Sequence, residues 1–388
     1  MGLLKVLFLV NFPAFVFGEV VRISLFNIEV RLLDITSAIL FIFWGAYCIK
    51  NNKISKIILL PFLLFIIFAF ASLVLNLTKL NLDQFATSLL YLLRWTAYVG
   101  ILPVVLGFDK NFKYLIKRML LFTGIMVVLL GYLQYFFYYD LSNLYYLGWD
   151  EHLYRMFSVF LDPNFAGAFF VLFFLFLLNL IFENLKSKDK LIIYSLLSAL
   201  TLITILLTYS RSSFVMLVFG VFLFLVIKKR VKYIVVIILA LAALTLVLPK
   251  AYKTEGTNFF RTASSEARLG SYSQGISIFK ESPIYGVGFN SYRFAKSRNA
   301  DIAAKPNLNS HADSSNDNSF LFVLATTGLI GFSIFVFMWY KILQKYKKSS
   351  LVIASICALF IDSFFINSLF YVPIMFWLWT LIGTTESK

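Results

Sequence analysis

The sequence contains few charged residues and almost no cysteine. Charged residues make up 14% of the 388 residues, against roughly 25% in an average soluble domain. Hydrophobic residues make up 60%, and this composition excludes an ordinary soluble globular enzyme and a disordered chain. The two cysteines, Cys48 and Cys357, both lie in apolar runs, so the sequence supports neither a disulfide framework nor a thiolate metal site.

Long apolar runs dominate the chain instead. Because a membrane-spanning helix needs about 20 mostly apolar residues, we expect an all-α fold, a polytopic transmembrane helix bundle of about twelve spans. The first run lacks an Ala-x-Ala-like cleavage site, so we interpret it as a retained anchor rather than a signal peptide. The expected spans lie near residues 4–18, 32–49, 57–75, 85–107, 114–137, 159–182, 191–208, 213–227, 231–248, 318–340, 351–366 and 369–382.

Positive charge is concentrated in alternate loops. The chain has 35 Lys and Arg against 19 Asp and Glu, a net charge of +16. Short basic loops stay on the cytoplasmic side, so we predict a multi-pass membrane protein with both termini in the cytoplasm. The bases are dispersed over several loops, which argues against a nucleic-acid partner. The basic loops carry Lys50, Lys53 and Lys56; Lys110, Lys113, Lys117 and Arg118; Lys186, Lys188 and Lys190; Lys228, Lys229, Arg230 and Lys232; and Lys341, Lys345, Lys347 and Lys348.

One long polar segment interrupts the series of spans. It divides the chain into spans one to nine (1–248), a large extracytoplasmic loop (249–317) and spans ten to twelve (318–388). A connection this long between short-looped helices is usually functional or disordered. Here its content argues against disorder.

The loop has the pattern of an amphipathic helix. Leu269, Tyr272, Ile276 and Phe279 recur at helical spacing within 266–281, and such a stripe predicts a helix lying on the outer membrane surface or over a cavity. Pro283 is expected to end this helix, and the segment Gly286-Val287-Gly288 supplies a turn.

Three arginines are candidates for binding an anion. Arg211, between Ser210 and Ser212 at the outer end of an apolar span, is either a snorkelling side chain with hydroxyl helix caps or a clamp for phosphate oxygens. In the second case the helix amides that begin at Ser212 add positive potential. Arg268 is either an exposed arginine or a second clamp. Arg94, inside an apolar span, makes either an interhelical hydrogen bond or a further anion contact.

Two histidines are candidates for proton transfer. His311 lies just before the tenth expected span, in the segment His311-Ala312-Asp313. An imidazole accepts a proton near neutral pH, and Asp313 either orients it or acts as the base itself. The alternative is a solvated loop histidine, and His152 in another outer loop is the second candidate. The outer loops contain no Asp-x-Asp, His-x-x-x-His or cysteine cluster, so neither a metal nor a cofactor is expected.

Three stretches of the sequence occur in a specific order. The first ends in Asp162-Pro163-Asn164 and begins at Arg155, and the second is Ser210-Arg211 with its flanking residues. The third combines Glu266-Ala267-Arg268, Ser282 to Gly288, Asn318-Ser319-Phe320-Leu321 and Gly328 to Gly331. Through these stretches the chain resembles the O-antigen ligase and O-antigen polymerase superfamily of bacterial envelope glycan enzymes, over about residues 150–340. Ser158 stands where that family usually has glycine.

This resemblance implies a specific chemistry. It implies a place in the bacterial cytoplasmic (inner) membrane and an active site under the external loop. It also implies an undecaprenyl-diphosphate-linked glycan as donor, a glycan or lipid acceptor, and transfer without a metal. It also implies functional arginines at Arg211 and Arg268 and a histidine base or orienter. Many members have His-Asn before the exit helix, but this chain has Asp317-Asn318. Either His311 acts from a shifted position, or Asp313 or Asp317 replaces it.

The sequence therefore favours a membrane glycosyltransferase of the O-antigen ligase or polymerase type, acting on the extracytoplasmic face. The expected catalytic residues are His311, Asp313, Arg211 and Arg268, and the expected substrate-binding residues are Arg211, Arg268, Arg155, Ser212, Asn318 and Arg94. The expected partners are the polyprenyl-diphosphate-linked glycan donor, the acceptor and membrane lipids. Two other hypotheses are a multi-span transporter or lipid-linked glycan flippase, which places ionisable groups near the midplane, and a non-catalytic scaffold.

Overall fold

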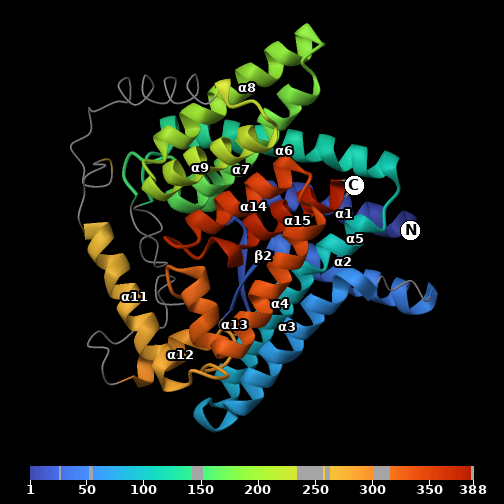
Figure 1. Ribbon diagram of the computed structural model, residues 1–388. Helices are drawn as coiled ribbons and strands as arrows, with labels where there is room; N and C mark the ends of the chain where they lie inside the picture. Colours follow the sequence, from blue (N-terminus) through green and yellow to red (C-terminus); the bar gives the residue numbers. More distant parts are fainter. Residues whose placement is uncertain are drawn as a thin grey trace.

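The computed structural model describes residues 1–25, 28–51, 56–141, 152–233, 257, 263–299 and 315–385. These residues form a bundle of α-helices with one two-stranded antiparallel hairpin (Figure 1), so the all-α prediction is confirmed for them apart from that hairpin. His311, Asp313 and most of the expected span at 231–248 lie outside the described residues.

The elements follow one another in this order. The first half of the bundle contains α1 (Gly2–Phe17), β1 (Arg22–Leu25), β2 (Ile28–Arg31), α2 (Leu32–Asn51), α3 (Lys56–Leu75), α4 (Leu82–Val99), α5 (Ile101–Leu106) and α6 (Lys110–Phe137). The second half contains α7 (Pro163–Glu183), α8 (Lys188–Leu207), α9 (Arg211–Ile227), α11 (Ala263–Glu281), α12 (Tyr292–Arg298), α13 (Ser319–Lys345), α14 (Ser350–Asp362) and α15 (Val372–Thr384). Short 3-10 turns lie at Leu77–Lys79, Ser158–Phe160 and Ser368–Phe370.

The prediction of about twelve spans is supported only in part. Within the described residues, six helical stretches are long and apolar enough to cross a membrane: Leu32–Asn51, Leu82–Leu106, Lys110–Phe137, Pro163–Glu183, Lys188–Leu207 and Ser319–Lys345. Several other apolar helices, such as α14 and α15, are shorter. A helix like α15, with 13 residues, is only about 20 Å long, less than the roughly 30 Å of a hydrocarbon core.

Aromatic side chains form much of the core. Helix α7 is buried on all sides from Ala166 to Leu178, which is the pattern of a helix surrounded by other helices. The ring of Trp377 on α15 lies edge-on to Phe169, Phe173 and Phe176 of α7, at centroid distances of 5.0, 5.9 and 6.0 Å. The high aromatic content of 19% therefore serves helix packing at the centre of the bundle.

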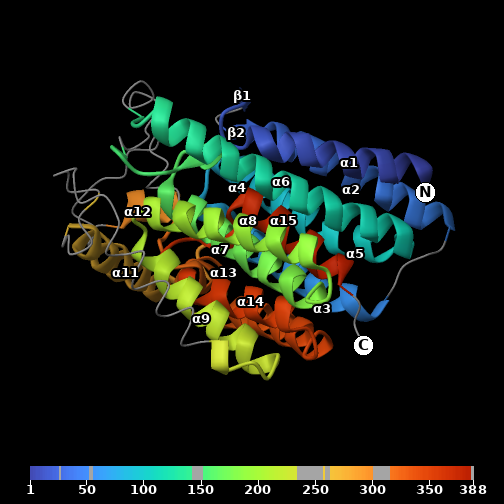
Figure 2. The same ribbon diagram turned by 90° about the horizontal axis from the view of Figure 1, so that it is seen from above.

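The two ends of the bundle carry different charges. Figure 2 shows both chain termini at one end, and α11 and α12 at the other. Lys117, Lys228, Lys345 and Lys348 line one pocket together with Thr385, so basic segments far apart in the sequence meet at the end that carries the termini. We call this the lysine end, and the opposite end, which carries Arg211 and α11, the arginine end.

Helix α13 is broken where a loop enters the bundle. Gly328 has a φ of 67° and interrupts the helix, and the segment from Pro283 to Gly288 docks against this break. The amide of Val287 donates to the carbonyl of Ala325 (3.1 Å), and that of Leu329 donates to the carbonyl of Pro283 (2.9 Å). A Cβ atom on Gly328 would collide with the backbone of Ile284. The glycine is therefore required by both its conformation and this close approach.

The loop helix is present, and its predicted apolar stripe is divided between the bundle and the exposed surface. Residues Ala263–Glu281 form α11 as expected. Leu269 and Ile276 are 66% and 47% exposed, whereas Ile278 is fully buried. Two members of the stripe contact the bundle: the hydroxyl of Tyr272 donates to the carbonyl of Phe364, and Phe279 packs against the hydrophobic core. Leu269 and Ile276 are exposed among the described residues, which is compatible with the expected position of this helix on the outer membrane surface.

Candidate functional site

The first turns of α7 and α9 are bound to each other at the arginine end. Asp162 caps α7 by accepting from the amide of Asn164 (2.6 Å). The side-chain oxygen of Asn164 then accepts from the hydroxyl of Ser210 (3.1 Å), the cap residue of α9, and Ser213 donates to Ser210 (3.0 Å). Two motifs that the sequence separates by about fifty residues therefore form one polar layer, and Arg211 extends from it.

Arg155 connects the same two motifs from the side. Its Nε donates to the carbonyl of Thr208 (2.9 Å), and the amide of Met156 donates to the carbonyl of Leu207 (2.9 Å). The Arg155 side chain is only 6% exposed. Its described contacts hold the chain before α7 against the end of α8, so this predicted substrate-binding residue lies beneath the polar layer.

Helix α11 brings Arg268 to Arg211. The guanidinium of Arg211 donates to the hydroxyl of Ser265 (3.0 Å) on the first turns of α11. Arg268 lies three residues further, on the same face of that helix, and its charge acts directly on Arg211. Both side chains are half-buried. Two arginines separated by 57 positions in the sequence thus lie close enough for their charges to interact.

Two acidic residues lie in the field of Arg268, and a third acts on both of them. The positive charge of Arg268 acts on Asp317 and on Asp362, and Asp162 contributes negative charge to both. The Arg268 guanidinium also lies 5.7 Å from the ring centroid of Phe365. The site therefore combines two cations with three carboxyl groups, a mixture able both to hold an anion and to exchange a proton.

Asp317 is held by α11 immediately before α13. Its amide donates to the hydroxyl of Ser271 (3.1 Å), and the neighbouring Asn316 donates to the carbonyl of Ser271 (2.5 Å). Burial raises the pKa of the Asp317 carboxyl above its usual value, although Arg268 opposes this shift. A carboxylate with a raised pKa is a better proton acceptor near neutral pH than an exposed aspartate.

Asp362 is a site residue that the sequence reasoning missed. It is the last residue of α14 and is fully buried. The hydroxyls of Ser212 and Ser368 lie beside it, but neither carboxyl oxygen has a hydrogen bond of good geometry among the described residues. An aspartate in an apolar run is costly and marks a functional site by default. That signal was available in the segment 351–366 but was read only as a span.

Asn318 and Ser212 have local roles in this structure. Asn318 caps α13, its side-chain oxygen accepting from the amides of Phe320 (2.9 Å) and Leu321 (3.0 Å). Ser212 is 2% exposed, and its hydroxyl lies 3.2 Å from that of Ser210. These two predicted substrate contacts are therefore part of the frame that positions Arg211 and Asp317.

Arg94 lies in a separate ionic cluster. Its guanidinium is 3.1 Å from the carboxylate of Asp34 and donates to the carbonyl of Glu29 (2.5 Å). Arg31 is 2.6 Å from Glu19 in the same cluster. The interhelical contact, one of the two alternatives for Arg94, is the one that the structure contains, and it ties α4 to the hairpin and α2.

Of the proton-transfer candidates His311, Asp313 and His152, the structure describes only His152. His311 and Asp313 lie outside the described residues. His152 is half-buried in a turn with a φ of 47°. Among the residues that the structure describes, no group of three or more His, Cys, Asp or Glu is placed to hold a metal ion.

Comparison with known families gives a match over the second half of the chain. Residues 196–336 match the O-antigen ligase family model. The matched stretch runs from within α8 into α13 and contains Arg211, Arg268, His311, Asp313 and Asn318. The resemblance inferred from the motifs is thus confirmed. None of the curated proteins compared with the chain matches it.

The matched stretch does not contain every part of the site. Arg155 and Asp162 precede the matched residues, and Asp362 follows them. All three nevertheless contact, or act electrostatically on, residues inside it. In this multi-pass membrane protein the ends of α7 and α14 therefore adjoin the matched stretch at the arginine pair.

Proposed function

We propose that this protein transfers a glycan from a polyprenyl diphosphate to a hydroxyl acceptor on the extracytoplasmic face of the membrane. The single observation that carries the proposal is the convergence of Arg211 and Arg268 at one end of the bundle, in the stretch that matches the O-antigen ligase family. Two guanidinium groups that repel each other in the free protein are well suited to the two negative phosphates of one diphosphate.

The proposed reaction needs charge stabilisation at the diphosphate. The acceptor oxygen forms a bond to the anomeric carbon of the glycan, and the bond from that carbon to the diphosphate oxygen breaks. The polyprenyl diphosphate leaves with the electron pair of this bond. Fixed cations that face the departing oxygen stabilise the charge that develops there, which is the role proposed for Arg211 and Arg268.

The acceptor hydroxyl must also lose its proton. The candidate bases are His311 and Asp313, as the sequence suggested, together with Asp317 and Asp362, which lie in the field of Arg268. Among the two described groups, Asp317 is half-buried and has a raised pKa, so we favour it over the fully buried Asp362. Asp362 then acts as a positioning residue for Arg268 and Ser212.

The charge distribution supports the orientation that this chemistry needs. The lysine end collects basic short loops, and such loops remain cytoplasmic. The arginine end then faces outward, where no ATP or nucleotide sugar is present, so a donor delivered in the membrane is required. In this orientation both termini are cytoplasmic and the large loop is extracytoplasmic, as expected from the sequence.

The alternative function is transport or flipping of a lipid-linked glycan. A transporter of that kind places its ionisable site near the bilayer midplane. Arg211 begins α9 and Ser265 lies on the loop helix, so the arginine pair belongs to a helix end rather than to a helix centre. This position favours the transferase.

The test is transfer by the purified full-length protein. A synthetic undecaprenyl-diphosphate oligosaccharide is incubated with the protein, alone and with candidate acceptors, and the products are identified by mass. Arg211→Gln and Arg268→Gln are expected to lose transfer while the protein remains folded. Arg298→Gln is the matched control, because Arg298 is an exposed arginine on α12 of the same loop. Full transfer by both site variants would reject the proposed mechanism.

A further inference from the structure

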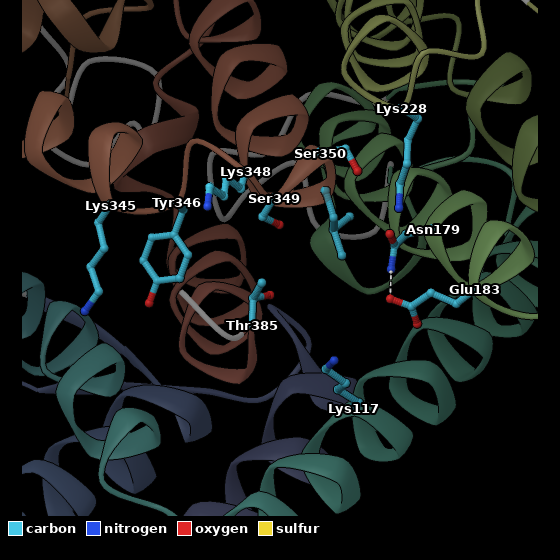
Figure 3. Close-up of a pocket in the computed structure, with 11 residues that line it drawn as sticks. Lys117, Asn179, Glu183, Lys228, Lys345, Tyr346, Lys348, Ser349, Ser350 and Thr385 are labelled. Atoms are coloured by element: carbon cyan, nitrogen blue, oxygen red, sulfur yellow. Dashed lines mark hydrogen bonds between the residues drawn. The ribbon is translucent and has the colours of Figure 1, made fainter. Parts of the chain in front are cut away.

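A second charged pocket lies at the lysine end, away from the arginine pair. It has a volume of about 190 Å³ and is lined by Lys117, Asn179, Glu183, Lys228, Lys345, Tyr346, Lys348, Ser349, Ser350, Leu351 and Thr385. Figure 3 shows these side chains arranged around the opening, with Lys345 and Tyr346 on one side and Lys228, Asn179 and Glu183 on the other. Nothing in the proposed transfer reaction uses this pocket.

The pocket is strongly positive. Four lysines line it, from the ends of α6, α9 and α13 and from the turn before α14, and the only acidic side chain among its lining residues is Glu183. The Glu183 carboxylate accepts a hydrogen bond from Asn179 (2.8 Å). Lysines that different helices bring together repel one another, so an anion between them is favoured.

Backbone and hydroxyl donors complete the positive field. Ser349 caps α14, its hydroxyl accepting from the amide of Val352 (3.3 Å), and Ser350 begins this 13-residue helix. The N-terminus of a helix offers unpaired amides and a positive dipole end to an anion. In this pocket Ser349, Ser350 and Leu351 belong to that first turn.

A buried hydroxyl gives an independent indication of a ligand. Tyr346 is 2% exposed, lines the pocket, and its hydroxyl has no hydrogen-bond partner among the described residues. Burial raises the pKa of Tyr346 to about 12, so the group keeps its proton and remains a donor. A buried donor without an acceptor destabilises the folded protein. An acceptor oxygen bound in the pocket removes that destabilisation.

We infer that this pocket binds a phosphate group, supplied by an anionic phospholipid headgroup or by a soluble phosphate compound. The volume is below the roughly 300 Å³ at which drug-sized ligands begin, so it suits one headgroup. The lining lysines lie at the ends of apolar helices, where the headgroups of a surrounding membrane are located, and basic pockets between spanning helices are known headgroup sites. A bound phosphate bridges the ends of α6, α9, α13 and α14.

The test compares the binding of phospholipids and inorganic phosphate by the wild-type full-length protein with their binding by two double variants. Protein purified in neutral detergent is titrated with phosphatidylglycerol, with phosphatidylcholine and, separately, with inorganic phosphate, and complexes are counted by native mass spectrometry. Lys345→Gln/Lys348→Gln removes two lining charges. Lys341→Gln/Lys347→Gln is the matched control, because these two lysines are exposed and belong to the same segment but do not line the pocket.

Phosphatidylglycerol is expected to bind the wild type and the control, and to bind the lining variant on the order of tenfold more weakly. Competition by millimolar inorganic phosphate would support the same site with a soluble ligand as its occupant. Equal binding by all three proteins, or equal binding of phosphatidylcholine and phosphatidylglycerol by the wild type, would overturn the inference.

A third variant separates binding from folding. Tyr346→Phe removes only the buried hydroxyl, so the lipid-free protein is expected to be as stable as the wild type or more stable. The same variant is expected to bind phosphatidylglycerol severalfold more weakly. Unchanged lipid binding by Tyr346→Phe would contradict the role given to this hydroxyl. None of these measurements uses a glycan donor, so their failure and the failure of the proposed function are distinguishable.

Discussion

Replacement of Arg268 by glutamine isolates the contribution of one guanidinium to transfer. Arg268 repels Arg211 but attracts Asp317 and Asp362. Loss of its charge therefore removes one repulsion and two attractions from the folded protein. The effect on the reaction is a slower transfer, because the departing diphosphate loses one of its two cations.

The expected magnitude follows from the chemistry of that loss. Removal of one fixed donor to a developing oxyanion lowers kcat by about 100-fold to 1,000-fold, or about 2.7–4 kcal/mol. We therefore expect Arg268→Gln to lower kcat by at least about 100-fold, with a change in Tm of only a few degrees. Arg268→Lys keeps the charge but not the planar fork of donors. Its kcat is expected to lie between that of the wild type and that of Arg268→Gln.

The assay for this prediction is the same transfer reaction, run with the wild type, both Arg268 variants and the control Arg298→Gln. Thermal unfolding in the same detergent reports folding in parallel. A value of kcat for Arg268→Gln within about threefold of the wild type, with Tm unchanged, would refute the diphosphate role of this arginine. A large fall in Tm would instead show that Arg268 is required for folding.

Three further predictions concern the frame and the base. Gly328→Ala is expected to lower the free energy of unfolding by about 2 kcal/mol or more, because a side chain at this positive φ collides with the backbone of Ile284. Thermal unfolding checks this, and the control Gly270→Ala on α11, with open space around it, is expected to leave Tm unchanged or higher. Asp34→Asn is expected to lower the free energy of unfolding by about 3 kcal/mol, because it leaves Arg94 with an uncompensated buried charge. Thermal unfolding measures this loss, with Asp83→Asn at an exposed position as the control. If Asp317 is the base, the rate rises with pH as its carboxyl loses a proton, and the raised pKa moves this limb above the usual range of an aspartate. Asp317→Asn is expected to remove that limb from the pH–rate profile, and an unchanged limb would assign the base elsewhere.

Much of the site was predictable from residue types and their order. Arg211 stood out because a guanidinium at the end of an apolar span needs an explanation, and the family resemblance singled out Arg268 with it. In the structure the charge of Arg268 acts on Arg211. The motif around Asn164 and the motif around Ser210 were recognisable separately. Their hydrogen bond was not predictable, because the pairing of α7 with α9 depends on how the whole bundle packs.

Other parts required the coordinates. The sequence allowed two roles for Arg94, and only the position of Asp34 across the helix pair identifies its partner. The periodicity of α11 predicted the helix but not which residues of its stripe face the bundle, because a helix beside a membrane can expose apolar residues such as Leu269. Asp362 was missed because its neighbours Ser212 and Ser368 come from other segments.

The central claim is that the arginine pair binds a diphosphate. Its most direct measurement is the affinity of the purified full-length protein for fluorescent undecaprenyl diphosphate without a glycan, compared with undecaprenyl monophosphate. We predict that the wild type and Arg298→Gln prefer the diphosphate, and that Arg211→Gln/Arg268→Gln loses this preference. Equal affinities for the two lipids in the wild type, or an undiminished preference in the double variant, would contradict the account.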